Sequence, residues 1–127
     1  MVGCPIPECT VIPEYNELNP DRHLSKFNSS KYGCYKANCG LENLRFAYGH
    51  DEYMYRMLVH NKCKIPEAGL AMIRYHSCYP LHRGNAYEHF YAEGDEKIIE
   101  SIIDFNQFDL YTKSDEKPDV GKLWPYY

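Results

Sequence analysis

The chain has 127 residues, of which 44% are hydrophobic, and this suits one small globular domain. Its 14 basic and 18 acidic side chains are interspersed and give a net charge of −4, so nucleic acid is not an expected partner. The start has no basic and apolar leader, and no stretch is apolar enough to cross a bilayer. We therefore expect a cytoplasmic protein with no membrane partner.

Residues 1–40 are expected to be mostly irregular. Proline recurs among Asn, Ser and Gly in this part of the chain, and no apolar period persists. Residues 41–127 read as helical, beginning with a short apolar group at Leu41, Leu44 and Phe46. No alternating β-branched run competes with the helical pattern. The predicted fold class is all-α.

The first well-marked helix is predicted over residues 50–60, because Asp51 and Glu52 supply acids to the first turn, where the helix dipole favours them. A second helix is predicted to open with Pro66 at its first position, to run to about residue 77, and to be stopped by Pro80.

A third helix is predicted to start at residues 94–95 and to reach Asp109. Isoleucines at 98, 99, 102 and 103 give it an amphipathic stripe. The tail from residue 114 is polar, and Pro125 suggests the first residue of one more helix.

Two histidines and one carboxylate are candidate metal ligands. His50 begins the first predicted helix and His76 lies near the end of the second, so an antiparallel hairpin would bring both imidazoles to the same end. Asp109 lies between Phe108 and Leu110, where an ionised carboxylate would be costly unless a cation neutralised it. Imidazole with carboxylate suits iron, manganese or zinc. Histidines at helix ends can instead cap carbonyls or lie in water.

Three segments, in the same order along the chain, resemble parts of myo-inositol oxygenase. They are residues 49–55 (GHDEYMY), 73–82 (IRYHSCYPLH) and 105–113 (FNQFDLYTK). The likeness continues at Val2-Gly3-Cys4, at Cys39-Gly40-Leu41 and at the closing Pro125-Tyr126-Tyr127, so it covers essentially the whole chain.

This resemblance implies a helical fold of the HD-domain superfamily that holds two iron ions and no organic cofactor. Family members use O2 to cleave myo-inositol to D-glucuronate in inositol catabolism. Carried across residue by residue, the resemblance makes His50 and His76 ligands of one iron and Asp109 a ligand of the other. His76, Ser77 and Lys113 match positions that contact the inositol. Asp51 keeps a structural role only, because the family's metal-binding His-Asp dyad lies further upstream.

The family's first histidine ligand and its His-Asp dyad have no counterpart in this chain. We therefore expect residues 1–127 to be the C-terminal portion of a single inositol oxygenase domain, truncated at both ends and inactive alone, and monomeric when complete. The alternative is a non-catalytic paralogue or a helical inositol-binding module, which would bind inositol without iron.

A structural zinc site is a further alternative, because Cys4, Cys9, Cys34 and Cys39 form two pairs, although their spacing departs from the usual two-residue gap. Without a secretion signal we expect reduced thiols. The remaining histidines are expected in water or bonded to carbonyls: His23, His60, His82 and His89. Four tyrosines near the candidate ligands are expected to serve in packing rather than redox chemistry: Tyr53, Tyr55, Tyr75 and Tyr79.

Overall fold

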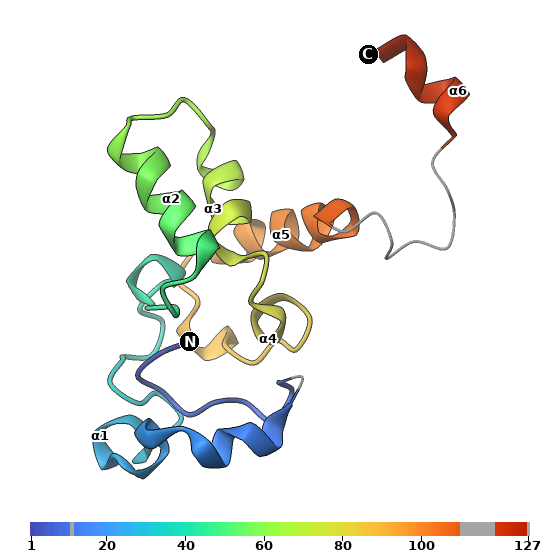
Figure 1. Ribbon diagram of the computed structural model, residues 1–127. Helices are drawn as coiled ribbons and strands as arrows, with labels where there is room; N and C mark the ends of the chain where they lie inside the picture. The colour runs from blue at the N-terminus through green and yellow to red at the C-terminus, as the bar shows by residue number, and fades with distance from the viewer. Residues whose placement is uncertain (11, 110–118, 127) are drawn as a thin grey trace.

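The computed structural model describes residues 1–10, 12–109 and 119–126 (Figure 1). Within these ranges the regular structure is entirely helical, which confirms the all-α prediction. No helix in the described ranges has the length and apolar character needed to cross a membrane. The predicted substrate contact Lys113 lies outside the described residues.

Short turns make up the first forty residues. They are the 3-10 turns η1 (Pro13–Leu18) and η2 (Pro20–His23) and the four-residue helix α1 (Ser25–Asn28). This segment is joined to the rest of the protein through its backbone, since the N–H of Val2 donates to the carbonyl of Arg45 at 2.8 Å and that of Gly40 to Phe90 at 2.8 Å.

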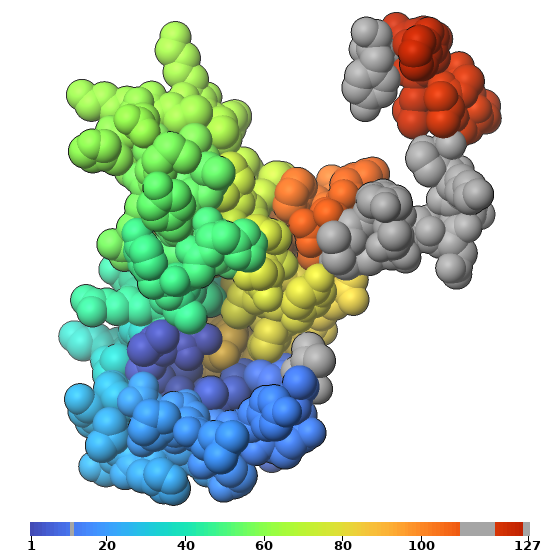
Figure 2. Space-filling model, viewed as in Figure 1, coloured from blue at the N-terminus to red at the C-terminus, as the bar shows by residue number. Residues whose placement is uncertain are grey.

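The central unit is an antiparallel hairpin of α2 (His50–His60) and α3 (Glu67–Tyr75), preceded by the 3-10 turn η3 (Leu41–Asn43). The long helix α5 (Asp95–Asp109) packs against α3, and α4 (Tyr79–His82) and η4 (Glu88–Phe90) connect them (Figure 1). Figure 2 shows η1, η2 and α1, in lighter blue, at one end of the molecule and α2, in green, toward the other. The largest fully buried side chains are those of Leu41, Leu44, Leu81, Phe90 and Ile102.

The bounds of α2 agree with the prediction, and α5 begins and ends as predicted. The start of α5 is fixed by Asp95, whose Oδ2 accepts hydrogen bonds from the N–H groups of Leu41 at 2.9 Å and Ala92 at 2.8 Å. This buried carboxylate ties the long helix to η3.

Two proline predictions were wrong. Pro66 is the extended residue before α3 (ψ 155°), not its first helical residue. Pro80 does not stop that helix, which ends at Tyr75; Pro80 lies in the first turn of α4, where its missing N–H costs nothing.

The tail also differs from prediction. A short helix, α6 (Val120–Leu123), begins after Asp119, whose side chain accepts a hydrogen bond from the N–H of Lys122. Pro125 is then the middle residue of the 3-10 turn η6 (Trp124–Tyr126), not the first residue of a helix. Aspartate is a favoured N-cap residue, and Asp119 occupies that position in α6.

Candidate metal centre

His50 and His76 meet side by side. Their Nε2 atoms are 3.4 Å apart, and the two rings lie edge to face with centroids 5.3 Å apart. His50 is the first residue of α2 and His76 directly follows α3, so the antiparallel hairpin brings the two imidazoles to the same end, as the sequence pattern predicted.

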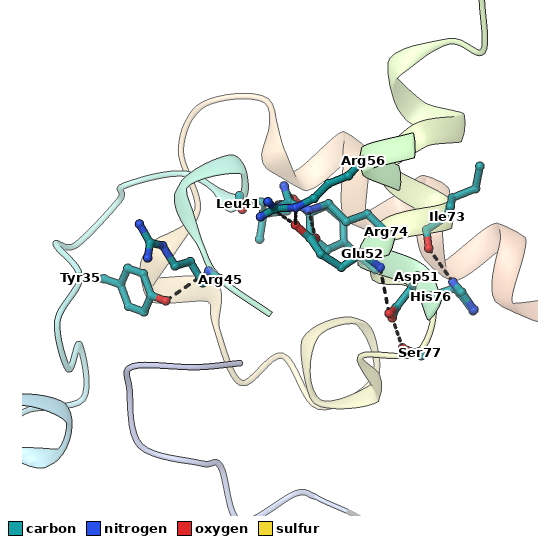
Figure 3. Close-up of polar contacts among 11 residues, drawn as sticks. Tyr35, Leu41, Arg45, Asp51, Glu52, Arg56, Ile73, Arg74, His76 and Ser77 are labelled. Carbon is teal, nitrogen blue, oxygen red and sulfur yellow. Dashed lines mark hydrogen bonds and ion pairs between the residues drawn. The ribbon is translucent and has the colours of Figure 1, made fainter. Parts of the chain in front are cut away.

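The ring of His76 is held by backbone contacts. Its Nδ1 lies 2.9 Å from the carbonyl oxygen of Ile73 (Figure 3). A carbonyl can only accept, so Nδ1 carries the proton and, in the neutral ring, Nε2 presents its lone pair toward His50. The carbonyl of His76 in turn accepts from Nε2 of His82 at 2.9 Å. His82 is thus a carbonyl-bonding histidine, as expected.

Asp51 and Ser77 form a second link beside the two histidines. The hydroxyl of Ser77 donates to Oδ2 of Asp51, and Oδ1 accepts from the N–H of Glu52 at 3.0 Å (Figure 3). Partial burial alone would raise the pKa of Asp51, but these hydrogen bonds and the nearby His50 outweigh it and lower the pKa. Asp51 therefore stays ionised and joins the two segments that carry the histidines.

Glu52 and Arg74 form an ion pair inside the hairpin, with only 3% and 8% of their surfaces exposed. Nε of Arg74 lies 2.7 Å from Oε2 of Glu52, and Nε of Arg56 lies 2.8 Å from Oε1 (Figure 3). Burial would raise the pKa of Glu52, but the hydrogen bonds from Arg74 and Arg56 lower it. The guanidinium of Arg74 also lies 4.6 Å from the ring centre of Tyr55.

The network continues from Arg74 to η3. Nη1 of Arg74 donates to the hydroxyl of Tyr75 at 2.9 Å, and that hydroxyl donates to the carbonyl of Leu41 at 3.2 Å. Burial raises the pKa of Tyr75 to about 12, so it stays a neutral donor. Sequence reasoning missed Glu52 and Arg74 as site residues. The only signal in the sequence was their position: Glu52 lies two residues after His50, and Arg74 lies two residues before His76.

Asp109 is the last residue of α5 and is partly buried. It lies one helical turn beyond Phe105, whose ring contacts that of His76 at 6.3 Å between centroids. The prediction that apolar side chains enclose Asp109 is wrong for Phe108, which is 74% exposed. Leu110, on the other side, lies outside the described residues. Across the described ranges no three His, Cys, Asp or Glu side chains gather closely enough to hold a metal ion.

The separation of the two imidazoles fits shared coordination of one ion. Nitrogens about 2.1 Å from a common metal lie roughly 3.0 Å apart at a right angle and roughly 3.4 Å apart at a tetrahedral angle. The Nε2 atoms of His50 and His76 are 3.4 Å apart. Two imidazole nitrogens at this separation suit iron, manganese or zinc.

The zinc alternative finds no support, since the described cysteines form no group of three ligands. All six cysteines are free thiols, and burial raises the pKa of Cys4 to about 11. Of the other histidines, His89 lies 3.3 Å from the carbonyl of Lys31, and His23 and His60 are exposed.

The fold and the site define a class: an all-α protein whose helical hairpin presents a pair of histidines suited to one metal ion. The family model described as myo-inositol oxygenase matches residues 1–127. The chain belongs to the myo-inositol oxygenase family.

Its curated relatives carry the same name. The chain is 48% identical over 126 residues to an inositol oxygenase of Dictyostelium discoideum, covering 99% of this chain and 43% of the relative. It is 46% identical to a probable inositol oxygenase of Oryza sativa subsp. japonica, again over 99% of this chain and 41% of the relative. An inositol oxygenase of Danio rerio is also 46% identical, with 99% and 45% covered. The chain thus spans less than half the length of these relatives.

Proposed function

We propose that this chain is the C-terminal portion of an inositol oxygenase domain with an HD-domain-like fold. The complete domain uses O2 to cleave myo-inositol to D-glucuronate, and it is a cytoplasmic monomer with no nucleic-acid or membrane partner. The observation that carries the proposal is the contact of 3.4 Å between Nε2 of His50 and Nε2 of His76, in a chain of this family. No organic cofactor is needed.

Each residue has a proposed part in this site. His50 and His76 hold one iron through their Nε2 atoms, and Asp109 brings a carboxylate to the second from the end of α5. The two irons, when bound, supply the redox chemistry with O2. The proton of His76 is fixed on Nδ1 by the carbonyl of Ile73, which leaves Nε2 available as a ligand. His76, Ser77 and Lys113 contact the inositol, and the positive charge of Lys113 favours an ionised substrate oxygen.

We further propose that the 127 residues alone have negligible activity. His50 and His76 give one iron two protein ligands, below the three typical of a catalytic metal site, and Asp109 gives the other only one. Two large side chains on the same face of α2 as His50 are exposed, which supports a covering segment that this chain does not contain. Tyr53, which we expected to pack, is 58% exposed, and Met54 is 42% exposed. The remainder of the family domain would cover this face and add ligands.

A chimaera tests the proposal. These 127 residues replace the matched region of the Dictyostelium discoideum relative, and iron content and D-glucuronate formed from myo-inositol and O2 are measured beside the isolated chain. We expect an active chimaera, an inactive isolated chain, and loss of activity of at least about 100-fold in the chimaera with His76→Ala. His60→Ala is the matched control, because His60 is an exposed histidine at the other end of α2.

Two outcomes would contradict the proposal. A chimaera that binds inositol but neither iron nor O2 would favour the non-catalytic, inositol-binding alternative. An isolated chain that holds about two irons and turns over inositol would overturn its predicted inactivity.

A further inference from the structure

Residues near the start of α2 contact residues at the end of α3. His50 contacts His76, which directly follows α3, and Glu52 contacts Arg74 on α3. Asp51 and Ser77 add a third contact at the same end. The two metal-ligand candidates and the buried ion pair are therefore set by the same alignment of the two helices.

We propose that Glu52 and Arg74 are positioning residues for the metal centre, because their buried ion pair sets the register that brings His50 and His76 to a distance at which both can bind one ion. This inference rests on the proposed function of the histidine pair. Neither Glu52 nor Arg74 is a metal ligand; both act through the histidines two residues away.

The ion pair is suited to fix one register because it tolerates no alternative. Apolar side chains can slide past one another with many similar packings, whereas an unpaired buried charge is strongly unfavourable. A shift by one helical turn, about 5.4 Å, would leave Arg74 buried without a carboxylate, and Glu52 would keep only the exposed Arg56 of its own helix. It would also separate the imidazoles beyond shared coordination.

The geometry of Arg74 strengthens the argument. Its Nε and Nη2 reach the two carboxylate oxygens of Glu52 at 2.7 and 3.4 Å, which restrains orientation as well as distance. Its third donor reaches Tyr75, which binds the carbonyl of Leu41. The pair thus ties α2, α3 and η3 together.

Arg56 offers a matched control within the same network. It donates to the same carboxylate at 2.8 Å, but it lies on α2 itself, four residues after Glu52, and 63% of its side chain is exposed. Removing Arg56 takes one guanidinium from Glu52 without touching the link between the helices. Arg74→Met and Arg56→Met therefore differ in the one property that the proposal requires.

The first measurement uses no metal. We expect nuclear Overhauser contacts between the rings of His50 and His76 in the full chain and in Arg56→Met, and their loss in Arg74→Met. Arg74→Lys, which keeps the charge, should retain them in part. If Arg74→Met does not fold, Glu52→Gln takes its place in the comparison, because glutamine keeps the size of the side chain and one hydrogen bond to Arg74. Ring contacts that persist in folded Arg74→Met would overturn the proposal.

The second measurement titrates the chain with Co²⁺ and follows its visible absorption bands. We expect binding that disappears in His76→Ala, weakens about 10–100-fold in Arg74→Met and changes less than about threefold in Arg56→Met. Equal affinity in folded Arg74→Met and in the unchanged chain would also overturn the positioning role. If the ring contacts depend on Arg74 but Co²⁺ does not bind through the histidines, the positioning role stands and the proposed metal function fails.

Discussion

The α2–α3 hairpin and the first forty residues are held in place by different means. In the hairpin, side chains meet side chains, and the buried pair Glu52–Arg74 aligns the two helices. In the first forty residues, backbone groups bond to distant backbone groups, as where the N–H of Gly40 donates to Phe90, and two tyrosine rings pack edge to face on Phe90. The arrangement of the hairpin is thus set by its own side chains, whereas the position of the N-terminal segment depends on the core that it covers.

The largest expected effect comes from the buried core residue against which the N-terminal segment packs. Phe90 is fully buried and lies against Tyr32 and Tyr35 at 6.0 and 5.5 Å between ring centroids. Phe90→Ala should lower the free energy of unfolding by about 3–5 kcal/mol, because it removes buried contacts and leaves a cavity. Urea unfolding followed by circular dichroism measures this change.

Phe108→Ala is the control for Phe90→Ala, since Phe108 is the same residue type but is 74% exposed on α5. We expect it to change stability by less than about 0.5 kcal/mol. Similar losses for the two variants would mean that the N-terminal segment does not depend on the buried ring, and the contrast between the regions would fail.

The difference between the regions also explains what the sequence could predict. The bounds of α2 and α5 follow from acids in the first turn and an apolar period, which are local signals. The meeting of His50 and His76 follows from two helix ends joined by a short loop. The bonds of Gly40 to Phe90 and of Val2 to Arg45 carry no side-chain signal, since any residue can form them.

The ion pair shows a different limit. The helix dipole accounts for an acid in the first turn of α2, and Arg74 falls within the second predicted helix, so no local signal marks either residue as buried. Only the register between the helices places Glu52 against Arg74, and one sequence does not show that register.

A smaller loss of stability is expected at Gly33 in the N-terminal segment, where an added side chain would cause both backbone strain and crowding. Gly33 has a φ of +56°, and a Cβ there would overlap the carbonyl oxygen of Gly3 and lie 2.5 Å from Cα of Cys4. Gly33→Ala should cost about 2–3 kcal/mol and should reduce hydrogen-exchange protection of residues 1–40 more than that of α2 and α3.

Gly94 provides the matched comparison, because its φ is +95° but a Cβ there would meet nothing within 4 Å. Gly94→Ala should therefore cost only the backbone strain, about 1–2 kcal/mol. If Gly33→Ala reduced protection equally in both regions, the N-terminal segment and the hairpin would unfold as one unit.

The smallest perturbation is chemical labelling of the cysteines, which reports on each region without a substitution. Cys4 is buried in the N-terminal segment, where burial raises its pKa to about 11, whereas Cys63 is exposed in the loop after α2. At pH 8 only about one Cys4 thiol in a thousand is the reactive thiolate. We therefore expect iodoacetamide to modify Cys63 at least about 100-fold faster than Cys4, as measured by peptide mass spectrometry.

The pH dependence of this labelling sharpens the comparison. Because a raised pKa favours the neutral thiol, the rate for Cys4 should grow about tenfold per pH unit between pH 8 and pH 10. Gly33→Ala, which crowds Cys4 directly, should raise that rate at pH 8, and Gly94→Ala should not. Equal rates for Cys4 and Cys63 at pH 8 would show that the N-terminal segment opens freely, and its backbone bonds to the core would then contribute little to holding it there.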